Sequence, residues 1–555
     1  AEPKDLQHWR VEAGDVAALP DGRLLCTTPR RITVEVTAGK EKRAIQDFSY
    51  EKIGILDPQG REAKLTILYD SPGAALHSPV YLGPRPRPPV LAQKVDPGRA
   101  TGVLFCQNAR FTKNTTAGWS HVRAIRVLAG KGLTTRSSHS YIVHAGSEVI
   151  ELGTVPLAPD GSFAVEVPAD TAIAFQAVDA EGRAELNEMS WIYVRPGETR
   201  GCLGCHQPRQ AAPPASAAQA MRTRPLKLLG QGQPHRFRGN NAAVTGLMEL
   251  QFDRYREVAG INRHTETVAS LVAQLKGKDE GLKISAAQRL SIFRDPVAAP
   301  ALADRLRDES REVRVASALS LAACGTRESV PPLLGALSDP DPLVAQAATV
   351  ALENLTGHAE REAQAWREWF RNTSWDKIEQ DLVQRLESAD RDVVRRAAVA
   401  LGHVGGDAAR TALRKYLARE RENNPFPEWR KDHRGDGARF NSLSAVNPRT
   451  LQAATRALGA LKDADAVPLL AETLSRHSEP EKGNLFLAEA AVEALGRIGT
   501  PEAEAALVAA FAVLRDYPQY TSWYGDHGAL MACHASPVHY FVVEALDALG
   551  SARAG

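Results

Sequence analysis

A repeated helical pattern fills the second half of this chain and constrains its fold more than any other feature. Seven times after residue 266, an apolar or β-branched residue is followed four positions later by a small residue and eight positions later by leucine. Positions i, i+4 and i+8 share one face of a helix, and a small central residue lets a neighbouring helix approach closely. The sets are Leu282/Ala286/Leu290, Val313/Ser317/Leu321, Val344/Ala348/Leu352, Val393/Ala397/Leu401, Thr450/Ala454/Leu458, Leu487/Ala491/Leu495 and Phe541/Ala545/Leu549.

The spacing of these sets indicates stacked pairs of helices. The first two intervals are 31 residues long, and insertions lengthen the later ones. Other apolar segments, such as 330–337, supply the second helix of each pair. Glycines that follow the leucine are expected where helices end; they are Gly325, Gly402, Gly459, Gly496 and Gly550. We therefore predict an all-α, HEAT-like solenoid over residues 266–555.

The first 200 residues show the alternation of β-strands instead. Apolar residues occupy every second position in 32–36, 162–167 and 173–178, which is the period of a half-buried strand. Asp160-Gly161 and Glu181-Gly182 supply turns between such runs. The sequence therefore predicts a multidomain protein with an N-terminal β region, sandwich-like in part, ahead of the solenoid.

A proline-rich stretch divides the β region. Proline cannot donate to a sheet ladder, so residues 83–94 are expected to form an extended linker. Before it, residues 1–82 form a small β region; after it, residues 95–200 form the sandwich-like domain. Residues 201–265 make an irregular segment between the sandwich and the solenoid.

That irregular segment begins with Cys202-Leu203-Gly204-Cys205-His206. Cys-x-x-Cys-His is the attachment sequence of a c-type haem. Each thiol can bond one vinyl group of the porphyrin, and the histidine is then the proximal ligand of the iron. We therefore expect one covalent haem c on Cys202 and Cys205, with its iron bound by His206.

Two other readings of the motif are weaker. A zinc site needs a second Cys or His pair at ligand spacing, and none follows closely. A thioredoxin-like pair needs a strand before it and a helix after it, whereas Pro208, Pro213 and Pro214 follow the motif.

The distal ligand decides what such a haem can do. A second strong ligand suits electron transfer, whereas an open position permits binding and catalysis. The candidates are His235, Met221, His264 and, from the solenoid, His534. For each of them, a surface or packing role is the alternative.

Four cysteines lie outside the motif. Cys26 and Cys106 form a disulfide in one reading and are buried small side chains in the favoured one; Cys324 lies in the solenoid. The fourth, Cys533, lies close to His527, His534 and His539. We interpret that cluster as a buried cysteine with helix-cap histidines in the last repeat, with a single-thioether haem or a metal site as alternatives.

The region around the motif resembles a known family. Residues 152–209, which include Leu152-Gly153-Thr154-Val155-Pro156, Trp191-Ile192-Tyr193-Val194 and the haem motif, are similar to the haem-bearing middle region of the hydrazine synthase α-subunit family. The resemblance also implies that residues 1–82 are the remnant of a propeller blade. In the family's catalytic haem it implies a tyrosine four residues after the motif histidine, which releases that histidine to zinc. Gln210 stands there in this chain.

These features favour a secreted or periplasmic c-type cytochrome that transfers electrons. The solenoid would then bind a redox partner protein or another cytochrome subunit. The alternatives are a haem enzyme of the hydrazine synthase-like class, acting on small nitrogen or oxygen compounds, and a haem-bearing scaffold or sensor. Charge is balanced, with 68 Lys+Arg against 66 Asp+Glu, so no nucleic-acid partner is expected. No apolar run is long enough to span a membrane. The start at Ala1 is expected from a removed signal peptide.

Overall fold

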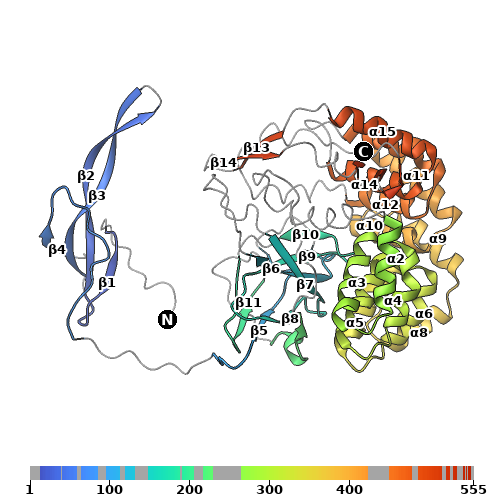
Figure 1. Ribbon diagram of the computed structural model, residues 1–555, viewed down its shortest axis with the longest axis horizontal. Helices are drawn as coiled ribbons and strands as arrows, with labels where there is room; N and C mark the ends of the chain where they lie inside the picture. The colour runs from blue at the N-terminus through green and yellow to red at the C-terminus, as the bar shows by residue number, and fades with distance from the viewer. Residues whose placement is uncertain are drawn as a thin grey trace. The chain divides into compact units, whose positions relative to one another are not determined.

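The computed structural model shows a chain of two compact units, Ala1–Gln93 and Lys94–Gly555, which are described separately (Figure 1). Strands occupy the first part of the chain and helices follow, so the predicted order of a β region before an all-α solenoid is confirmed. The structure describes residues 13–38, 41–58, 64–84, 95–112, 119–131, 148–187, 191–204, 217–228, 264–422, 449–477, 485–515, 520–524, 529–533 and parts of 542–551.

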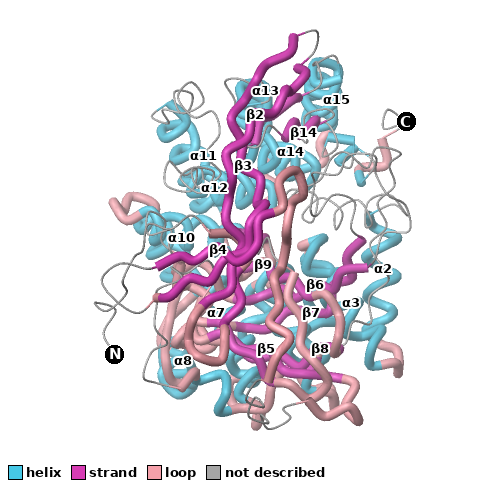
Figure 2. Tube along the Cα trace, turned by 90° about the vertical axis from the view of Figure 1, so that its left-hand side faces the viewer, coloured by secondary structure: helices cyan, strands magenta, loops and turns pink. Residues whose placement is uncertain are grey.

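The N-terminal unit is one four-stranded sheet in which each strand pairs antiparallel with the next. The strands β2 and β3 extend as a long hairpin (Figure 2). A four-stranded antiparallel meander is also the topology of one propeller blade, as the resemblance implies for residues 1–82. The strands are β1 (Val16–Ala18), β2 (Leu24–Ala38), β3 (Glu41–Asp57) and β4 (Lys64–Asp70).

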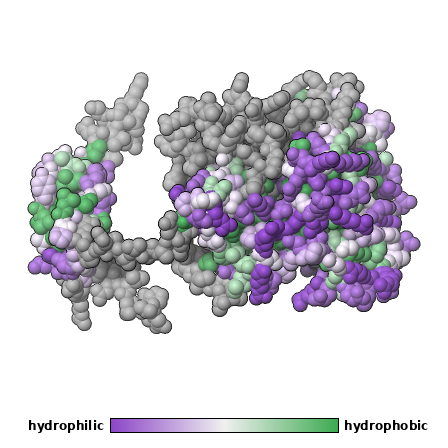
Figure 3. All heavy atoms as spheres, turned by 60° about the horizontal axis from the view of Figure 1, so that its bottom comes forward, coloured by the Kyte–Doolittle hydropathy of each residue, from purple (hydrophilic) through white to green (hydrophobic). Residues whose placement is uncertain are grey.

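This single sheet leaves much of its apolar surface uncovered. Val16, Phe48 and Leu68 are each about half exposed, and Figure 3 shows apolar surface on this unit. A sheet buries an apolar face only when another layer packs on it. Cys26 is fully buried as a free thiol, which agrees with the favoured packing role, while the alternative of a disulfide with Cys106 stays a prediction.

The second unit begins with two facing four-stranded sheets. One has the order β10-β9-β6-β7 and the other the order β11-β5-β8-β12. Side chains of both sheets share a core, in which the rings of Phe163 and Phe175 meet edge to face at 5.3 Å. This is the predicted sandwich, but its edge strand β12 comes from residues 201–265, which were expected to be irregular. The strands are β5 (Thr101–Cys106), β6 (Ala124–Lys131), β7 (Glu148–Pro156), β8 (Phe163–Pro168), β9 (Ile173–Val178), β10 (Ala184–Asn187), β11 (Thr199–Cys202) and β12 (Leu226–Lys227).

The local signals of this domain are confirmed. Strands β8 and β9 coincide with the runs of alternating apolar residues at 162–167 and 173–178. Gly161 and Gly182 have φ angles of 82° and 76°, a left-handed conformation that tight turns need and glycine adopts without strain. Both predicted turns therefore form.

The solenoid consists of helix pairs. One helix of each pair belongs to a continuous ladder, in which α3, α5, α7, α10, α12 and α14 each pack on the next. The described helices of the chain are α2 (His264–Leu275), α3 (Glu280–Phe293), α4 (Ala299–Arg305), α5 (Arg311–Cys324), α6 (Val330–Ala336), α7 (Pro342–Thr356), α8 (Ala363–Arg371), α9 (Trp375–Arg385), α10 (Arg391–Val404), α11 (Asp407–Glu422), α12 (Arg449–Ala460), α13 (Val467–His477), α14 (Leu485–Ile498) and α15 (Pro501–Arg515).

The ladder helices carry the repeated sets. In α5, α7, α12 and α14 all three members of each set are buried. In α3 the set is only partly right, because Leu282 is 50% exposed and the buried face of the helix begins at Gly281 instead.

Three of the glycines expected at helix ends have a different role. Gly402, Gly459 and Gly496 lie inside the last turns of α10, α12 and α14. A Cβ on Gly459 would lie 2.4 Å from the Cα of Ala494, so the missing side chain lets two ladder helices touch. These glycines therefore serve helix packing and do not end the helices. The helices end a few residues later; Gly405 follows α10 and Gly499 follows α14.

The solenoid has two hydrophobic cores. The near half (α2–α8) shares one continuous core with the β-sandwich, which includes Leu104, Val155, Leu290 and Leu352. The far half (α9–α15) has a core of its own, which includes no side chain from the described residues of the sandwich. The sandwich and the near half of the solenoid are therefore one folded body, although the sequence shows them as successive domains.

Near the C-terminus, Tyr520–Tyr524 (β13) and Ala529–Cys533 (β14) pair as an antiparallel hairpin. Cys533 therefore ends a strand, and this stretch departs from the all-α solenoid expected up to residue 555. Aromatic residues of β13 favour strands, and this preference outweighs the helical repeat pattern that predicted an all-α solenoid here. His527, His534 and His539 lie outside the described residues. In the described part of the chain, no helix has the length and apolarity to cross a membrane.

Candidate functional site

Strand β11 carries the first cysteine of the haem motif to the end of a sheet. It pairs parallel with β5, and Cys202 lies level with Cys106. Beyond the strands the two backbone segments stay together, because Gln107 N–H donates to the Cys202 carbonyl at 2.9 Å and Asn108 N–H to the Leu203 carbonyl at 3.2 Å. Cys205 and His206 lie outside the described residues, so both stay predictions.

Gly204, the third residue of the motif, fixes the path of the chain. A Cβ at this position would lie 2.3 Å from the Phe111 carbonyl oxygen and 3.0 Å from that of Asn108. Only glycine lets the motif pack this closely on the 107–111 turn. The motif pattern treats this position as free, so the requirement is visible in the tertiary structure alone.

The segment that follows the motif is anchored on a neighbouring turn. Gln219 N–H donates to Asp160 Oδ2 and Ala220 N–H to Ser162 Oγ, both at 2.9 Å. Burial acts to raise the pKa of Asp160, but hydrogen bonds from Ser162 and Gln219 outweigh it and lower that pKa. The Asp160–Ser162 turn in turn contacts the 107–111 turn, since Ala109 N–H donates to the Gly161 carbonyl at 2.8 Å.

Both flanks of residues 205–216 are therefore held by one pair of linked turns. Beside these turns lies apolar surface: the Phe105 ring covers Gly201 and packs with Ala158, Ala164 and Ala220. Aromatic and small apolar side chains therefore lie on the outer face of the sheet, beside the strand that carries Cys202.

Of the distal candidates, Met221 is the one whose side chain the structure describes. It lies in the short helix η2 (Gln219–Arg222), next to the anchored Ala220, and is 39% exposed. His264 is the first residue of α2, and its side chain lies outside what the structure describes. His235 and His534 also lie outside the described residues.

A second polar site joins the sandwich to the far half of the solenoid. The turn between β9 and β10 presents four charged side chains at alternate positions, 179, 181, 183 and 185, to the ladder helices. We call these contacts the ionic seam. They are Arg395–Asp179 at 3.1 Å, Arg395–Glu185 at 3.2 Å, His403–Glu181 at 3.2 Å and Arg183–Glu493 at 2.9 Å, together with Arg449–Glu185. Within the sandwich, His121 also contacts Glu185.

The ionic seam shifts several pKa values. Burial raises the pKa of Asp179 despite the charge of Arg395. For Glu181, burial opposes ionisation, but the hydrogen bond from His403 and the charge of Arg183 hold the pKa well below its usual value. The same balance, with Arg449 and Arg395, lowers the pKa of Glu185. Sequence reasoning identified this segment as a turn and missed its charges, although their two-residue period was a visible signal.

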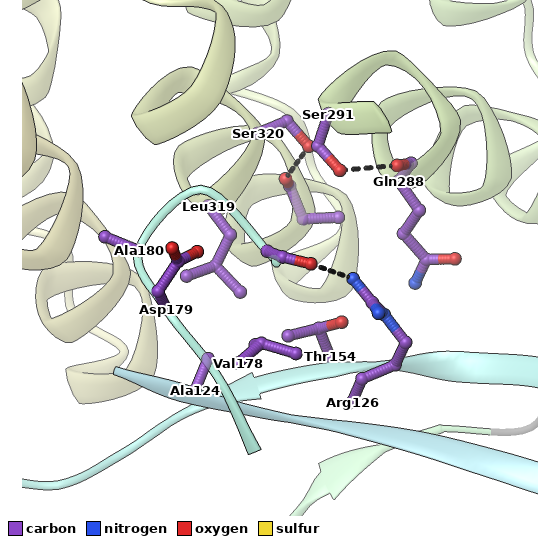
Figure 4. A pocket seen from close by; sticks show the side chains of 12 residues that line it. Ala124, Arg126, Thr154, Val178, Asp179, Ala180, Gln288, Ser291, Leu319 and Ser320 are labelled. Carbon is purple, nitrogen blue, oxygen red and sulfur yellow. Dashed lines mark hydrogen bonds between the residues drawn. The ribbon is translucent and has the colours of Figure 1, made fainter. Parts of the chain in front are cut away.

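A small cavity lies beside the ionic seam, between sheet β10-β9-β6-β7 and helices α3 and α5 (Figure 4). Arg126 donates to Gln176 Oε1 at 2.8 Å and to the Gly182 carbonyl there. The cavity volume is about 30 Å³, which is room for a water molecule and not for an organic substrate. Among the described residues, no cluster of three or more Cys, His, Asp or Glu side chains could hold a metal ion.

Comparison with known proteins identifies two families along the chain. Residues 120–207 match the model of the hydrazine synthase alpha subunit middle domain. Residues 300–381 and 439–517 match HEAT repeats. The resemblance seen in the sequence and the predicted solenoid are both confirmed. Curated proteins give no match.

Among solved structures, three are similar to parts of this chain. Kuenenia stuttgartiensis hydrazine synthase is 19% identical, with a TM-score of 0.27 over 38% of this chain and 32% of its own. This chain thus spans about a third of the hydrazine synthase chain. Human deoxyhypusine hydroxylase is 22% identical, with a TM-score of 0.22 over 55% of this chain and 92% of its own. The CpcE–CpcF complex of phycocyanin lyase from Nostoc is 21% identical, with a TM-score of 0.20 over 51% and 94%.

Proposed function

We propose that this chain is an exported c-type cytochrome that transfers electrons through one covalently bound haem. The observation that carries the proposal is the Cys202-Leu203-Gly204-Cys205-His206 motif, which begins at the end of β11 and lies in the segment that matches the hydrazine synthase alpha subunit middle domain. Attachment of haem c takes place outside the cytoplasm, which is why the proposal includes export to the periplasm or beyond.

The chain's own residues would hold and orient the group. Cys202 and Cys205 would form the two thioether bonds, and His206 would bind the iron. Gly204 packs the motif on the 107–111 turn, and Asp160 and Ser162 anchor the segment behind it. Haem supplies one-electron chemistry when it is bound.

A haem enzyme is the second candidate, and the match of residues 120–207 to a hydrazine synthase domain favours it. Gln210 in place of the tyrosine implied by that resemblance leaves His206 available for iron rather than zinc. Carbon monoxide separates the two candidates. A reduced spectrum that carbon monoxide leaves unchanged supports electron transfer, whereas a carbon monoxide complex supports an open iron and catalysis, or a sensor.

The distal ligand can be found by the same spectrum. Met221, His235, His264 and His534 are replaced by alanine one at a time. The variant that newly binds carbon monoxide identifies the ligand. Met221→Ala has priority because η2 follows the anchored end of the haem segment.

For partners, HEAT repeats commonly form interaction surfaces, and a redox protein or a second cytochrome subunit is the proposed occupant here. In this chain the ladder helices α10, α12 and α14 already contact the β9–β10 turn. A partner would therefore bind a part of the solenoid that the ionic seam leaves uncovered.

The central experiment tests covalent attachment. The chain is produced with the haem-attachment machinery, denatured in acid and separated on a gel stained for haem. Haem should stay on the wild-type chain and on a Cys324→Ala control, since that thiol is buried in α5. It should be lost in the Cys202→Ser, Cys205→Ser double variant. Release of haem from the wild-type chain by acid would refute the proposal.

A further inference from the structure

A third cysteine lies beside the haem motif in space. In the parallel pair of β5 and β11, Cys106 and Cys202 occupy the same register position. Cys106 is 2% exposed, whereas Cys202 is half-buried. The two residues are almost 100 positions apart in the sequence, so nothing in the motif pattern indicates their contact.

Both side chains project from the same face of the sheet. In the preceding register pair, a Cβ on Gly201 would lie 2.3 Å from the Phe105 ring, so partners at one position point the same way. Alternation along β5 then places Cys106 on the opposite, inner face, where it is part of the sandwich core. Cys202 packs against that same core. The two Cβ atoms are therefore neighbours on the inner face.

The spacing suits a disulfide. Neighbouring strands lie about 4.8 Å apart, and disulfides join residues whose Cα atoms are about 4.4–6.8 Å apart. Cys202 is the last residue of β11, so its backbone can move toward Cys106 without breaking the pairing in the middle of a strand.

We infer that, in the chain without haem, Cys106 and Cys202 form a disulfide when a protein or small-molecule disulfide is present as oxidant. The thiolate of Cys202, the more exposed of the two, attacks the oxidant and forms a mixed disulfide with release of one thiol. The thiolate of Cys106 then displaces the second thiol. One Sγ–Sγ bond forms in the chain, one breaks in the oxidant, and two protons and two electrons pass to the oxidant.

This disulfide would compete with haem for Cys202, a consequence that rests on the proposed function. A sulfur atom in a disulfide cannot add to a vinyl group, so the haem-free chain with this bond has only Cys205 left for attachment. Reduction of the Cys106–Cys202 bond would then be a required step before complete attachment, and Cys106 a residue that controls the yield of holoprotein.

The test uses the full chain made without haem and kept in a glutathione redox buffer. Remaining thiols are alkylated, and the chain is digested with trypsin under non-reducing conditions. Cleavage at arginine yields the peptides 100–110 and 201–209. We expect these two peptides to be joined through Cys202 in the mass spectrum, with Cys205 alkylated. A Cys202–Cys205 disulfide within peptide 201–209, or alkylation of both Cys106 and Cys202, would overturn the inference.

A variant separates this inference from the proposed function. Cys106→Ala keeps a small apolar side chain in the core and removes the competing thiol. Under oxidising conditions it should raise the fraction of chain with covalent haem about twofold, if disulfide formation and attachment take Cys202 at equal rates. An unchanged fraction refutes the competition. Haem absent from both wild type and variant would refute the proposed function, while the peptide map still decides the disulfide.

Discussion

The β-sandwich contacts the two halves of the solenoid through different chemistry. Against the near half it buries apolar side chains in one shared core, which includes Val155 of the sandwich and Leu321 of the solenoid. Against the far half it presents charges, and Arg183 and Glu493 form one of several largely buried ion pairs. An apolar contact tolerates small shifts, whereas a buried ion pair needs defined geometry. The near half therefore supplies stability, and the ionic seam defines where the far half lies on the sandwich.

The largest expected effect comes from a substitution that disrupts the core shared by the sandwich and the near half of the solenoid. Ala348 and Ala491 are both fully buried at the centre of a repeated set, one in each half. Arginine at either position should cost about 3–5 kcal/mol, through overpacking and a buried unpaired charge. Ala348→Arg should speed hydrogen exchange in strand β6 of the sandwich, whereas Ala491→Arg should leave β6 protected. Equal exchange in the two variants would show that the cores are not separate.

The next effect concerns the ionic seam. Arg395→Ala removes the partner of Asp179 and one partner of Glu185, which leaves buried charge and should cost about 3 kcal/mol of unfolding free energy. Arg195→Ala is the control, because its pair with Asp170 is about half exposed and should contribute less than about 1 kcal/mol. Urea denaturation measures both. Similar costs would mean that the seam is as weak as a surface ion pair.

A smaller effect tests packing within the far half. Alanine at Gly459 would press on Ala494 and should cost about 1–3 kcal/mol. Alanine at Gly335 in α6 meets no atom within 4 Å and should stabilise the chain by about 0.5–1 kcal/mol. Thermal denaturation should shift in opposite directions. A gain from Gly459→Ala would show that the ladder helices do not need glycine to touch.

The smallest effect near neutral pH is the pH dependence of the ionic seam. Glu181, Glu185 and Glu493 have pKa values below the usual 4.5, so the stability they contribute is present above pH 4.5 and is lost as the pH falls through their lowered values. The raised pKa of Asp179 acts in the opposite direction, since its proton relieves a buried charge.

Hydrogen exchange from pH 7 to 3, corrected for intrinsic rates, should show residues 179–185 losing protection below pH 4.5 while β8 keeps it. In Glu493→Gln this loss should be smaller, because one of the three carboxylates no longer titrates. Parallel loss of protection in β8 would mean that acid unfolds the sandwich and not the seam.

The sequence by itself determined the order of β region and HEAT repeats, the positions of β8 and β9, and the resemblance around Cys202. These features depend on local periodicity or on a short motif, both of which are contiguous in the chain. The haem and its distal ligand stay predictions from the sequence.

Tertiary structure decided the rest, because the contacts join residues far apart in sequence. Gly204 is required only because the Phe111 carbonyl lies against it, and Gly459 packs helices although it resembles a helix end. The charges at 179–185 acquire partners more than 200 residues away. Cys106 and Cys202 become neighbours only through the register of two parallel strands. Register depends on the whole sheet, and no local pattern in either strand specifies it.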